Sequence, residues 1–163
     1  MRLYILRHAQ AEDLAPDHAR ELTSRGIRYT KKMASFLKNN AHFDPRQIWH
    51  SPYTRAVQTA KIFAESAHLD AKLIEKEKLT PVDDPSFLIP TLNHEKESTL
   101  IVGHNPYLAL LAGRLLGTEQ FTVAVEMKKA ALVCLARYAN YTPAEPPLWV
   151  LRWMLTPQLF EAN

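Results

Sequence analysis

A short apolar run, residues 3–6, leads directly to Arg7 and His8. Apolar side chains at every position of this run predict a strand that is buried on both faces, as in a parallel sheet. Arg7 and His8 then lie at the carboxyl end of the strand, which is the edge of an open α/β sheet that binds ligands. Because a guanidinium group repels metal ions and fits the oxygens of phosphate well, we expect an anion-binding site at this edge.

Two further apolar runs end in residues with similar chemistry. Residues 47–50 are followed by Ser51, a favourable helix cap, and Arg55 lies in the first turn of the predicted helix. The helix dipole disfavours a cation at this end of a helix, which indicates that Arg55 is there to bind an anion. Residues 99–102 lead to His104. Since the carboxyl ends of parallel strands meet at one edge, the three strands together predict a phosphate site.

The rest of the chain alternates strand-like and helix-like segments. The last two apolar runs have no helix between them and therefore predict an antiparallel hairpin. The expected α/β fold is a three-layer α/β/α sandwich in a single domain over residues 1–163, with a mostly parallel central sheet and an antiparallel C-terminal hairpin. The strands are expected near 3–6, 47–50, 71–74, 99–102, 130–138 and 148–154, and the helices near 24–39, 52–67, 85–95 and 106–116.

Residue types at the helix ends and helical spacing predict further details. Ser51 and Asn105 are expected to cap the second and fourth helices, with Pro52 and Pro106 as the first helical residues. Gly26 weakens the first helix, and close approach to a neighbouring segment is the expected reason for it. The predicted inward-facing residues are Gly26, Tyr29, Met33, Phe36 and Leu37 in the first helix and Phe87, Leu88 and Leu92 in the third.

The composition narrows the range of partners. The formal net charge is +3, with a pI of about 9.0 and no block of like charges, so a nucleic-acid partner is not expected. The one cysteine, Cys134, lies in an apolar run and is expected to pack as a small apolar side chain. No signal peptide opens the chain and no apolar run could span a membrane, so we expect a cytoplasmic protein without a membrane partner. The sequence leaves the oligomeric state open.

Four segments resemble, in the expected order, the motifs of the histidine phosphatase superfamily, whose members have the phosphoglycerate mutase-like fold. They are residues 6–9, the pair Leu22 and Thr23 with Gly26, residues 51–60 and residues 103–106. The short length of the chain and the segment at 79–81 most resemble the SixA-type phosphohistidine phosphatases. The resemblance implies this fold and a phosphatase activity that needs neither a metal nor another cofactor.

The resemblance also implies a role for each matching residue. His8 would be the nucleophile that accepts the phosphoryl group, and Arg7 and Arg55 would bind its oxygens. His104 would donate a further hydrogen bond to the phosphate. Arg20 matches an arginine of the short phosphatases and would either line the pocket or lie in a surface loop.

The sequence departs from the family pattern in two places. Ala9 occupies a position that is usually glycine, and its small side chain is expected to fit the turn. The proton donor is not identified, because Lys78 occupies the position that carries a glutamate in the short phosphatases. Glu75 and Glu77 are the candidates, and a solvated charged stretch is the favoured alternative for both.

These features predict a phosphatase that hydrolyses phosphohistidine on a protein partner, such as a phosphotransfer domain, through a phosphohistidine intermediate at His8. The alternatives are a small-molecule phosphomonoesterase of the same superfamily and an inactive module that binds phosphohistidine. To attack phosphorus His8 must be neutral, and nearby arginines would lower its pKa below about 6.5. Its other ring nitrogen is expected to donate to a backbone carbonyl. The missing acid favours phosphohistidine as substrate, because the leaving imidazole can be protonated by solvent beforehand.

Overall fold

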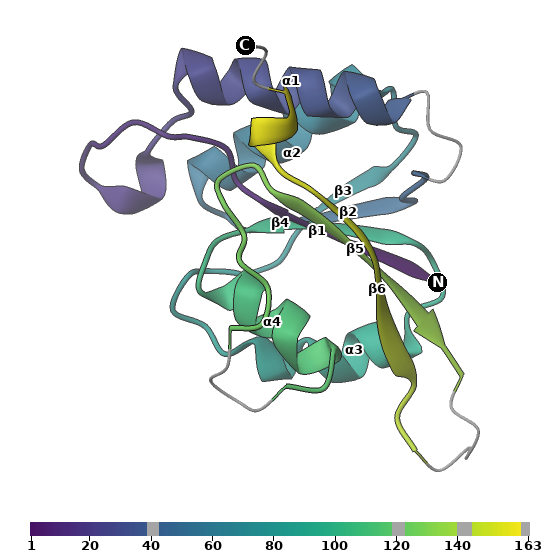
Figure 1. The fold of residues 1–163 in the computed structure, drawn as a ribbon. Coiled ribbons are helices and arrows are strands. Elements are labelled where there is room, and N and C mark those ends of the chain that lie inside the picture. The colour runs from purple at the N-terminus through teal and green to yellow at the C-terminus, as the bar shows by residue number, and fades with distance from the viewer. Residues whose placement is uncertain (39–42, 119–122, 140–144, 161–163) are drawn as a thin grey trace.

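The structure is a computed structural model that describes residues 1–38, 43–118, 123–139 and 145–160. A six-stranded sheet lies between two layers of helices, as Figure 1 shows. No helix within the described ranges is long and apolar enough to cross a membrane. The strands are β1 (Arg2–Arg7), β2 (Gln47–His50), β3 (Lys72–Glu75), β4 (Thr99–Gly103), β5 (Leu132–Tyr138) and β6 (Leu148–Leu155). The helices are α1 (Ser24–Lys38), α2 (Thr54–Ala67), α3 (Ile89–His94) and α4 (Tyr107–Leu115), and short 3₁₀ segments are η1 (Asp17–Ala19), η2 (Pro85–Phe87) and η3 (Pro157–Phe160).

The sheet has the strand order β3-β2-β4-β1-β5-β6. The strands from β3 to β1 pair in parallel, whereas β5 runs antiparallel to β1, and β6 runs antiparallel to β5. Parallel neighbours need long crossover connections, and the helices between the strands supply them. The predicted three-layer sandwich, with its mostly parallel sheet and antiparallel C-terminal hairpin, is therefore confirmed.

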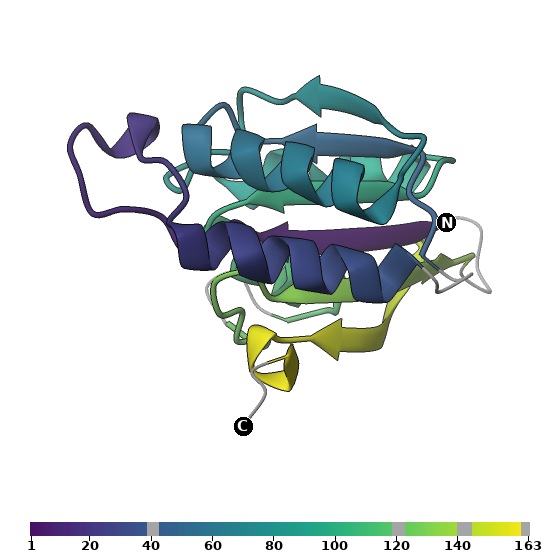
Figure 2. The ribbon, with the colours of Figure 1, turned by 90° about the horizontal axis from the view of Figure 1, so that it is seen from above.

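Each face of the sheet has its own apolar core. α1 and α2 lie side by side over one face, and α3 and α4 lie over the other (Figures 1 and 2). Within β1, Tyr4 and Leu6 point to the core under α1 and α2, whereas Leu3 and Ile5 point to the opposite core. All four side chains are fully buried, because successive residues of a strand point to opposite faces and both faces are covered.

The second helix begins later than the sequence predicted. α2 starts at Thr54 and not at Pro52. The reason is that Ser51 still belongs to the edge of the sheet: its amide donates to Val102 O at 3.0 Å, and its hydroxyl lies 2.8 Å from His104 Nε2. A residue held in this way is not available as a helix cap.

The fourth helix differs from the prediction in the same sense. α4 starts at Tyr107 and not at Pro106, and the side chain of Asn105 does not cap it. Instead, Asn105 Nδ2 donates to Met127 O at 3.0 Å. This hydrogen bond ties the end of β4 to the segment that leads into β5.

Two aromatic side chains predicted to face the core are exposed. Met33 and Leu37 of α1 are buried, but 55% of Phe36 is exposed, because each step along a helix turns the side chain by about 100°. Phe87 is 66% exposed and lies in η2, before α3 begins. The ammonium of Lys78 lies 4.7 Å from the centroid of its ring. These two predictions were wrong because fewer side chains of each segment are buried than the spacing of its apolar residues indicated.

Gly26 is required where α1 meets the segment after β1. A Cβ atom at this position would overlap the backbone carbonyl oxygen of Gln10. The same oxygen accepts a hydrogen bond from the Thr23 amide at 2.9 Å, and the Thr23 hydroxyl accepts one from Gly26 N at 3.0 Å. The expected close approach is therefore confirmed, and it holds the first turn of α1 against the chain that follows His8.

The substitution Gly26→Ala should lower the free energy of unfolding by about 1–3 kcal/mol, because overpacking forces apart two hydrogen-bonded backbone segments. Urea denaturation measures the loss. Gly103→Ala is the matched control, since a Cβ there would lie 3.6 Å from its nearest neighbours, an ordinary contact distance. Equal losses in the two variants would contradict the role given to Gly26.

Candidate active site

The strand ends that the sequence singled out meet at one edge of the sheet. β1 and β4 pair so that Arg7 lies beside Gly103, and the amide of His8 extends this pairing by donating to Gly103 O at 2.8 Å. His104 follows β4 directly. The rings of His8 and His104 consequently lie 5.0 Å apart, centroid to centroid.

A cavity of about 300 Å³, which we call the rim cavity, opens at this edge. His8, the proposed nucleophile, and the four residues that the sequence proposed for phosphate binding all line it. The complete lining is Arg7, His8, Ala11, Asp17, Arg20, Arg55, Pro81, His104, Asn105 and Lys129. Arg20 follows η1 in an extended segment, and its side chain lines the rim cavity.

The two candidate proton donors lie elsewhere. Glu75 ends β3 and Glu77 follows it, and both are exposed. Both line a different cavity, together with Phe87 and Tyr107, and neither lines the rim cavity. The structure thus does not bring either glutamate to His8, which agrees with the solvated charged stretch that the sequence favoured.

The ring of His8 is held in one orientation and one tautomer. Its Nδ1 lies 2.7 Å from the carbonyl oxygen of Ala9, and Arg55 Nε donates to its Nε2 at 3.3 Å. Because an arginine nitrogen can only donate, Nε2 must accept, and the proton of the neutral ring is on Nδ1. The expected hydrogen bond to a backbone carbonyl is therefore confirmed, and Nε2 carries the lone pair.

The pKa of His8 is lowered to about 3, mainly because burial disfavours the charged imidazolium. The hydrogen bond to Ala9 acts in the opposite direction, and the charges of His104, Arg55 and Arg7 add smaller decreases. The sequence analysis expected the arginines to cause the shift. Their effect has the expected sign, but burial contributes more, and the ring is neutral at pH 7.

His104 is buried and also neutral at pH 7. Burial and, to a smaller extent, the positive charge of Arg55 together lower its pKa to about 3. Its Nε2 lies 2.8 Å from the hydroxyl of Ser51, which fits a hydroxyl donating to that nitrogen. Nδ1 of His104 then carries the proton, and among the described residues it has no hydrogen-bond partner.

A second buried donor is unsatisfied beside it. Arg7 Nη1 donates to Met127 O at 2.8 Å, but Arg7 Nε has no partner among the described residues. Leaving a buried donor unpaired costs about 1–3 kcal/mol. Two such donors on side chains that line one cavity are the expected signature of a site that completes its hydrogen bonds with a ligand.

Asp17 is a cavity residue that the sequence analysis missed. Its carboxylate pairs with Arg55 Nη2 at 3.0 Å and with Arg20 Nη1 at 3.1 Å, and its backbone oxygen accepts from Arg55 Nη1. Burial acts to raise the pKa of Asp17, but hydrogen bonds from Arg55 and Arg20 outweigh it and hold the pKa below its usual value. Asp17 lies in an irregular polar segment, where no periodicity could have identified it.

Lys129 is the other charged residue of the cavity lining that was missed. It precedes β5, and because β5 runs antiparallel to β1, the start of β5 lies at the same edge as the end of β1. The amide of Ala130 donates to His8 O at 3.1 Å and fixes this segment. The predicted antiparallel hairpin contained the necessary signal, since residues before an antiparallel strand share an edge with residues after a parallel one.

The motif residues around position 58 connect α2 to the nucleophile segment. Thr59 Oγ1 accepts from Ala9 N at 3.2 Å and donates to Arg55 O at 2.6 Å. Gln58 Oε1 accepts from Leu22 N at 2.8 Å. Ala9 does not have a positive φ angle, so glycine is not required there, and the expectation that alanine fits the turn is confirmed.

The rim cavity has no cluster suited to a metal ion. Over the described parts of the chain, no group of three or more histidine, cysteine or carboxylate side chains has the arrangement of a metal site. Of the charged side chains that line the rim cavity, four are the guanidinium and ammonium groups of Arg7, Arg20, Arg55 and Lys129, which bind anions, and one is the carboxylate of Asp17.

Comparison with known protein families shows which class of protein this fold and site resemble. The model of the histidine phosphatase superfamily (branch 1) matches residues 3–82, which include Arg7, His8, Arg20 and Arg55. Over these residues the chain is similar to the histidine phosphatase superfamily.

Particular relatives narrow the similarity. Phosphohistidine phosphatase SixA of Escherichia coli (strain K12) is 29% identical over 120 residues, which cover 71% of this chain and 74% of SixA. A solved structure of the protein histidine phosphatase SixA complexed with tungstate has a TM-score of 0.83 at 23% identity, covering 99% of this chain and 100% of that one. A mycobacterial glucosyl-3-phosphoglycerate phosphatase, solved with VO3, has a TM-score of 0.71 at 18% identity, covering 93% and 98%. At these identities the two solved structures support the fold alone.

Stability should depend on pH through the two buried histidines. In the unfolded chain a histidine has a pKa of about 6.5, whereas His8 and His104 have pKa values of about 3 in the fold. Below pH 6.5 the unfolded chain takes up protons that the folded chain excludes. The free energy of unfolding should therefore fall from pH 6.5 to pH 5, by up to about 1.4 kcal/mol per pH unit for each histidine.

Urea denaturation at several pH values between 7 and 5 measures this slope, above the range in which the acidic groups with lowered pKa titrate. The variant His8→Gln lacks one of the two buried imidazoles and should have a smaller slope than the wild type. An unchanged slope would contradict the burial argument for His8.

The variant Asp17→Asn should bind inorganic phosphate about two- to fivefold more tightly, the range that a partly exposed ion pair allows. The amide keeps the shape of the side chain but no longer competes with the anion for Arg55 and Arg20. Isothermal titration with phosphate measures the change. Asp44→Asn is the matched control, since Asp44 pairs with Arg46 outside the rim cavity. Weaker binding in Asp17→Asn than in the control would contradict the competition.

Proposed function

We propose that this protein is a phosphatase that hydrolyses phosphohistidine on a protein partner, with His8 as the nucleophile. The observation that carries the proposal is the chemistry of the rim cavity. An imidazole whose Nε2 holds a lone pair lies there among arginine and lysine side chains and two unsatisfied buried donors. The similarity to phosphohistidine phosphatase SixA supports the substrate class.

The reaction proceeds in two displacements. His8 Nε2 attacks phosphorus in line, a bond forms between Nε2 and phosphorus, and the bond from phosphorus to the substrate imidazole breaks. The electron pair of the broken bond goes to the substrate nitrogen. The hydrogen bond from His8 Nδ1 to Ala9 O stabilises the positive charge that the His8 ring acquires. Water then attacks phosphorus, and the bond from phosphorus to His8 Nε2 breaks. The electron pair of that bond returns to Nε2, and inorganic phosphate is the product.

The cationic residues stabilise the charge that is spread over the phosphoryl oxygens. Arg7, Arg55 and the N–H at His104 Nδ1 are donors that line the same cavity as His8, and Arg20 and Lys129 add positive charge there. Phosphoryl transfer depends mainly on positioning and on such electrostatic stabilisation. Each of the three donors, Arg7, Arg55 and His104, is expected to contribute a factor on the order of 10²–10³ to the rate.

The absence of a suitable acid among the described cavity residues supports phosphohistidine over alkyl phosphates. An alkoxide leaving group needs a proton as the bond breaks. Glu75 and Glu77 line another cavity and cannot supply it to a group bound beside His8. Asp17 lines the rim cavity, but hydrogen bonds from Arg55 and Arg20 outweigh the effect of burial and hold its pKa below the usual value, so it is ionised. The imidazole of phosphohistidine needs no protein acid, since solvent can protonate it before the bond breaks.

Two alternatives make different predictions. The structural similarity to a glucosyl-3-phosphoglycerate phosphatase keeps a small phosphate ester as the second candidate substrate. An inactive module that binds phosphohistidine is less consistent with the site, because a binder has no need of a neutral histidine whose lone pair is aligned by Arg55.

A trapping experiment tests the proposal. With a protein carrying radiolabelled phosphohistidine, rapid quenching should find label on His8 in a bond that is labile in acid and stable in base. The variant His8→Ala should take up no label. His94→Ala is the matched control, because His94 lies at the surface outside the rim cavity, and it should be labelled like the wild type.

Other outcomes would contradict parts of the proposal. Rapid release of phosphate without label at any quench time would mean that water attacks directly and that His8 is not the nucleophile. Neither label nor release would remove phosphohistidine as substrate. Rapid hydrolysis of small phosphate esters in that case would favour the phosphomonoesterase alternative.

A further inference from the structure

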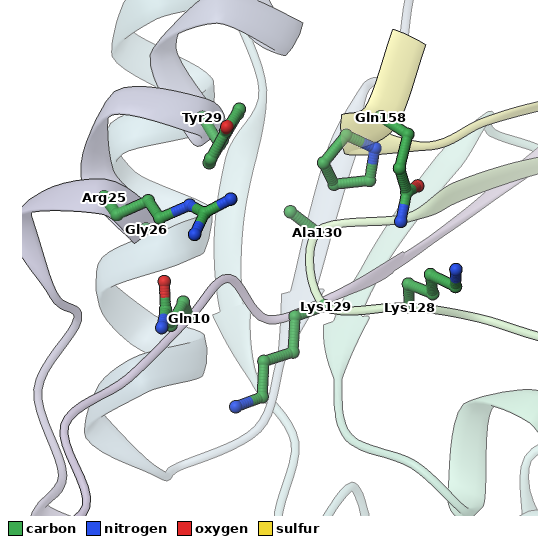
Figure 3. A pocket seen from close by; sticks show the side chains of 9 residues that line it. Gln10, Arg25, Gly26, Tyr29, Lys128, Lys129, Ala130 and Gln158 are labelled. Atoms are coloured by element: carbon green, nitrogen blue, oxygen red, sulfur yellow. The ribbon is translucent and has the colours of Figure 1, made fainter. Parts of the chain in front are cut away.

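A second cavity, of about 280 Å³, lies between the first turns of α1, the segment before β5 and η3 (Figure 3). We call it the basic groove. Its lining residues are Gln10, Arg25, Gly26, Tyr29, Lys128, Lys129, Ala130, Pro157 and Gln158. Lys129 lines the rim cavity as well, so the basic groove is adjacent to the proposed phosphate site.

The charge of the basic groove has one sign. Arg25, Lys128 and Lys129 contribute three cations, and no carboxylate is present among the described residues that line it. Lys128 and Lys129 are exposed, and neither forms an ion pair with a described residue. In Figure 3, Arg25 extends from α1 toward Ala130 on the opposite wall, whereas the side chains of Lys128 and Lys129 point away from Arg25.

The wall of the groove that carries the lysines is rigid. Ala130 has a φ of 60°, a left-handed conformation that costs a residue with a Cβ about 1–2 kcal/mol. Two hydrogen bonds hold it: Ala130 N donates to His8 O at 3.1 Å, and Ala131 N donates to Lys128 O at 2.8 Å. The segment that carries the lysine pair is thus hydrogen-bonded directly to the backbone of His8.

Uncharged hydrogen-bonding groups complete the groove. Gln10 and Gln158 present side-chain amides, and Tyr29 presents a phenol whose ring lies 5.3 Å from the guanidinium carbon of Arg25. Amides, phenols and cations together match carboxylates and backbone carbonyls, which are the acceptors of an acidic peptide segment.

We propose that the basic groove binds an acidic segment of the phosphorylated protein, so that the enzyme prefers phosphohistidines with aspartate or glutamate a few residues away. The proposal rests on the proposed function and adds a sequence preference to it. An extended peptide advances by about 3.3 Å per residue, so a carboxylate three to six residues from the phosphohistidine can reach an adjacent cavity. Electrostatic attraction of this kind raises the association rate and weakens with added salt.

A pair of synthetic peptides tests this preference. One carries aspartate at positions three to six from a phosphohistidine, and the other carries asparagine at the same positions. Free phosphohistidine is the third substrate. The wild type should hydrolyse the aspartate peptide with the highest kcat/KM, and this advantage should shrink as salt is added.

The double variant Arg25→Gln/Lys128→Gln should lose about fivefold in kcat/KM on the aspartate peptide, as expected for two peripheral charges. Its kcat/KM on the asparagine peptide and on free phosphohistidine should change less than twofold. Lys129 is left intact because it also lines the rim cavity. The matched control is Lys31→Gln/Lys96→Gln, which removes the same charge from exposed positions outside the groove.

The outcomes separate this proposal from the proposed function. Equal losses on all three substrates, or equal losses in the control variant, would overturn the groove while leaving the phosphatase activity in place. Equal kcat/KM values for the two peptides in the wild type would do the same. If none of the three substrates is hydrolysed, the proposed function and the sequence preference both fail.

Discussion

The parallel pairing of β1 with β4 is the interaction on which the candidate site depends. It places Arg7 beside Gly103 and allows the amide of His8 to bond to Gly103 O, so that two histidines far apart in the chain face each other across 5.0 Å. α2 is then attached to the same edge through Thr59, which bonds to the backbone on both sides and brings the guanidinium of Arg55 to the His8 ring. A shift of one residue in this pairing would move every side chain of β1 to the opposite face of the sheet and dismantle the cavity.

Burial and positive charge act together on the two histidines. Both effects disfavour protonation, so the rings stay neutral although they lie in a cavity lined by carboxylate as well as cations. The ion pairs of Asp17 with Arg55 and Arg20 partly neutralise the positive charge that an anion would otherwise meet. The free site therefore avoids the cost of several unpaired cations at the edge of the sheet. When a phosphoryl group binds, the two arginines would exchange one negative partner, the Asp17 carboxylate, for another.

The sequence predicted the parts of the fold that depend on local patterns. Apolar runs at 3–6 and 99–102 became central strands because both of their faces are covered, and residues after those runs lie together because parallel strands share an edge. Details that depend on tertiary contacts were predicted less well. Ser51 does not cap α2 because its hydroxyl contacts His104, and Phe36 falls just outside the buried stripe of α1. Asp17 and Lys129 come from irregular segments, whose position follows from long-range hydrogen bonds and not from any repeating pattern. The catalytic roles of His8, Arg7, Arg55, Arg20 and His104 stay predictions.

The hydrogen bond from His8 Nδ1 to the Ala9 carbonyl also decides which ring nitrogen carries the phosphoryl group in the proposed mechanism. Since Nδ1 is occupied, only Nε2 can accept the phosphoryl group, and the enzyme intermediate would be a single positional isomer of phosphohistidine. Each of the two in-line displacements inverts the configuration at phosphorus. A complete turnover would therefore return phosphate with net retention of configuration, because the covalent intermediate divides the reaction into two inversions, whereas direct attack by water would give inversion.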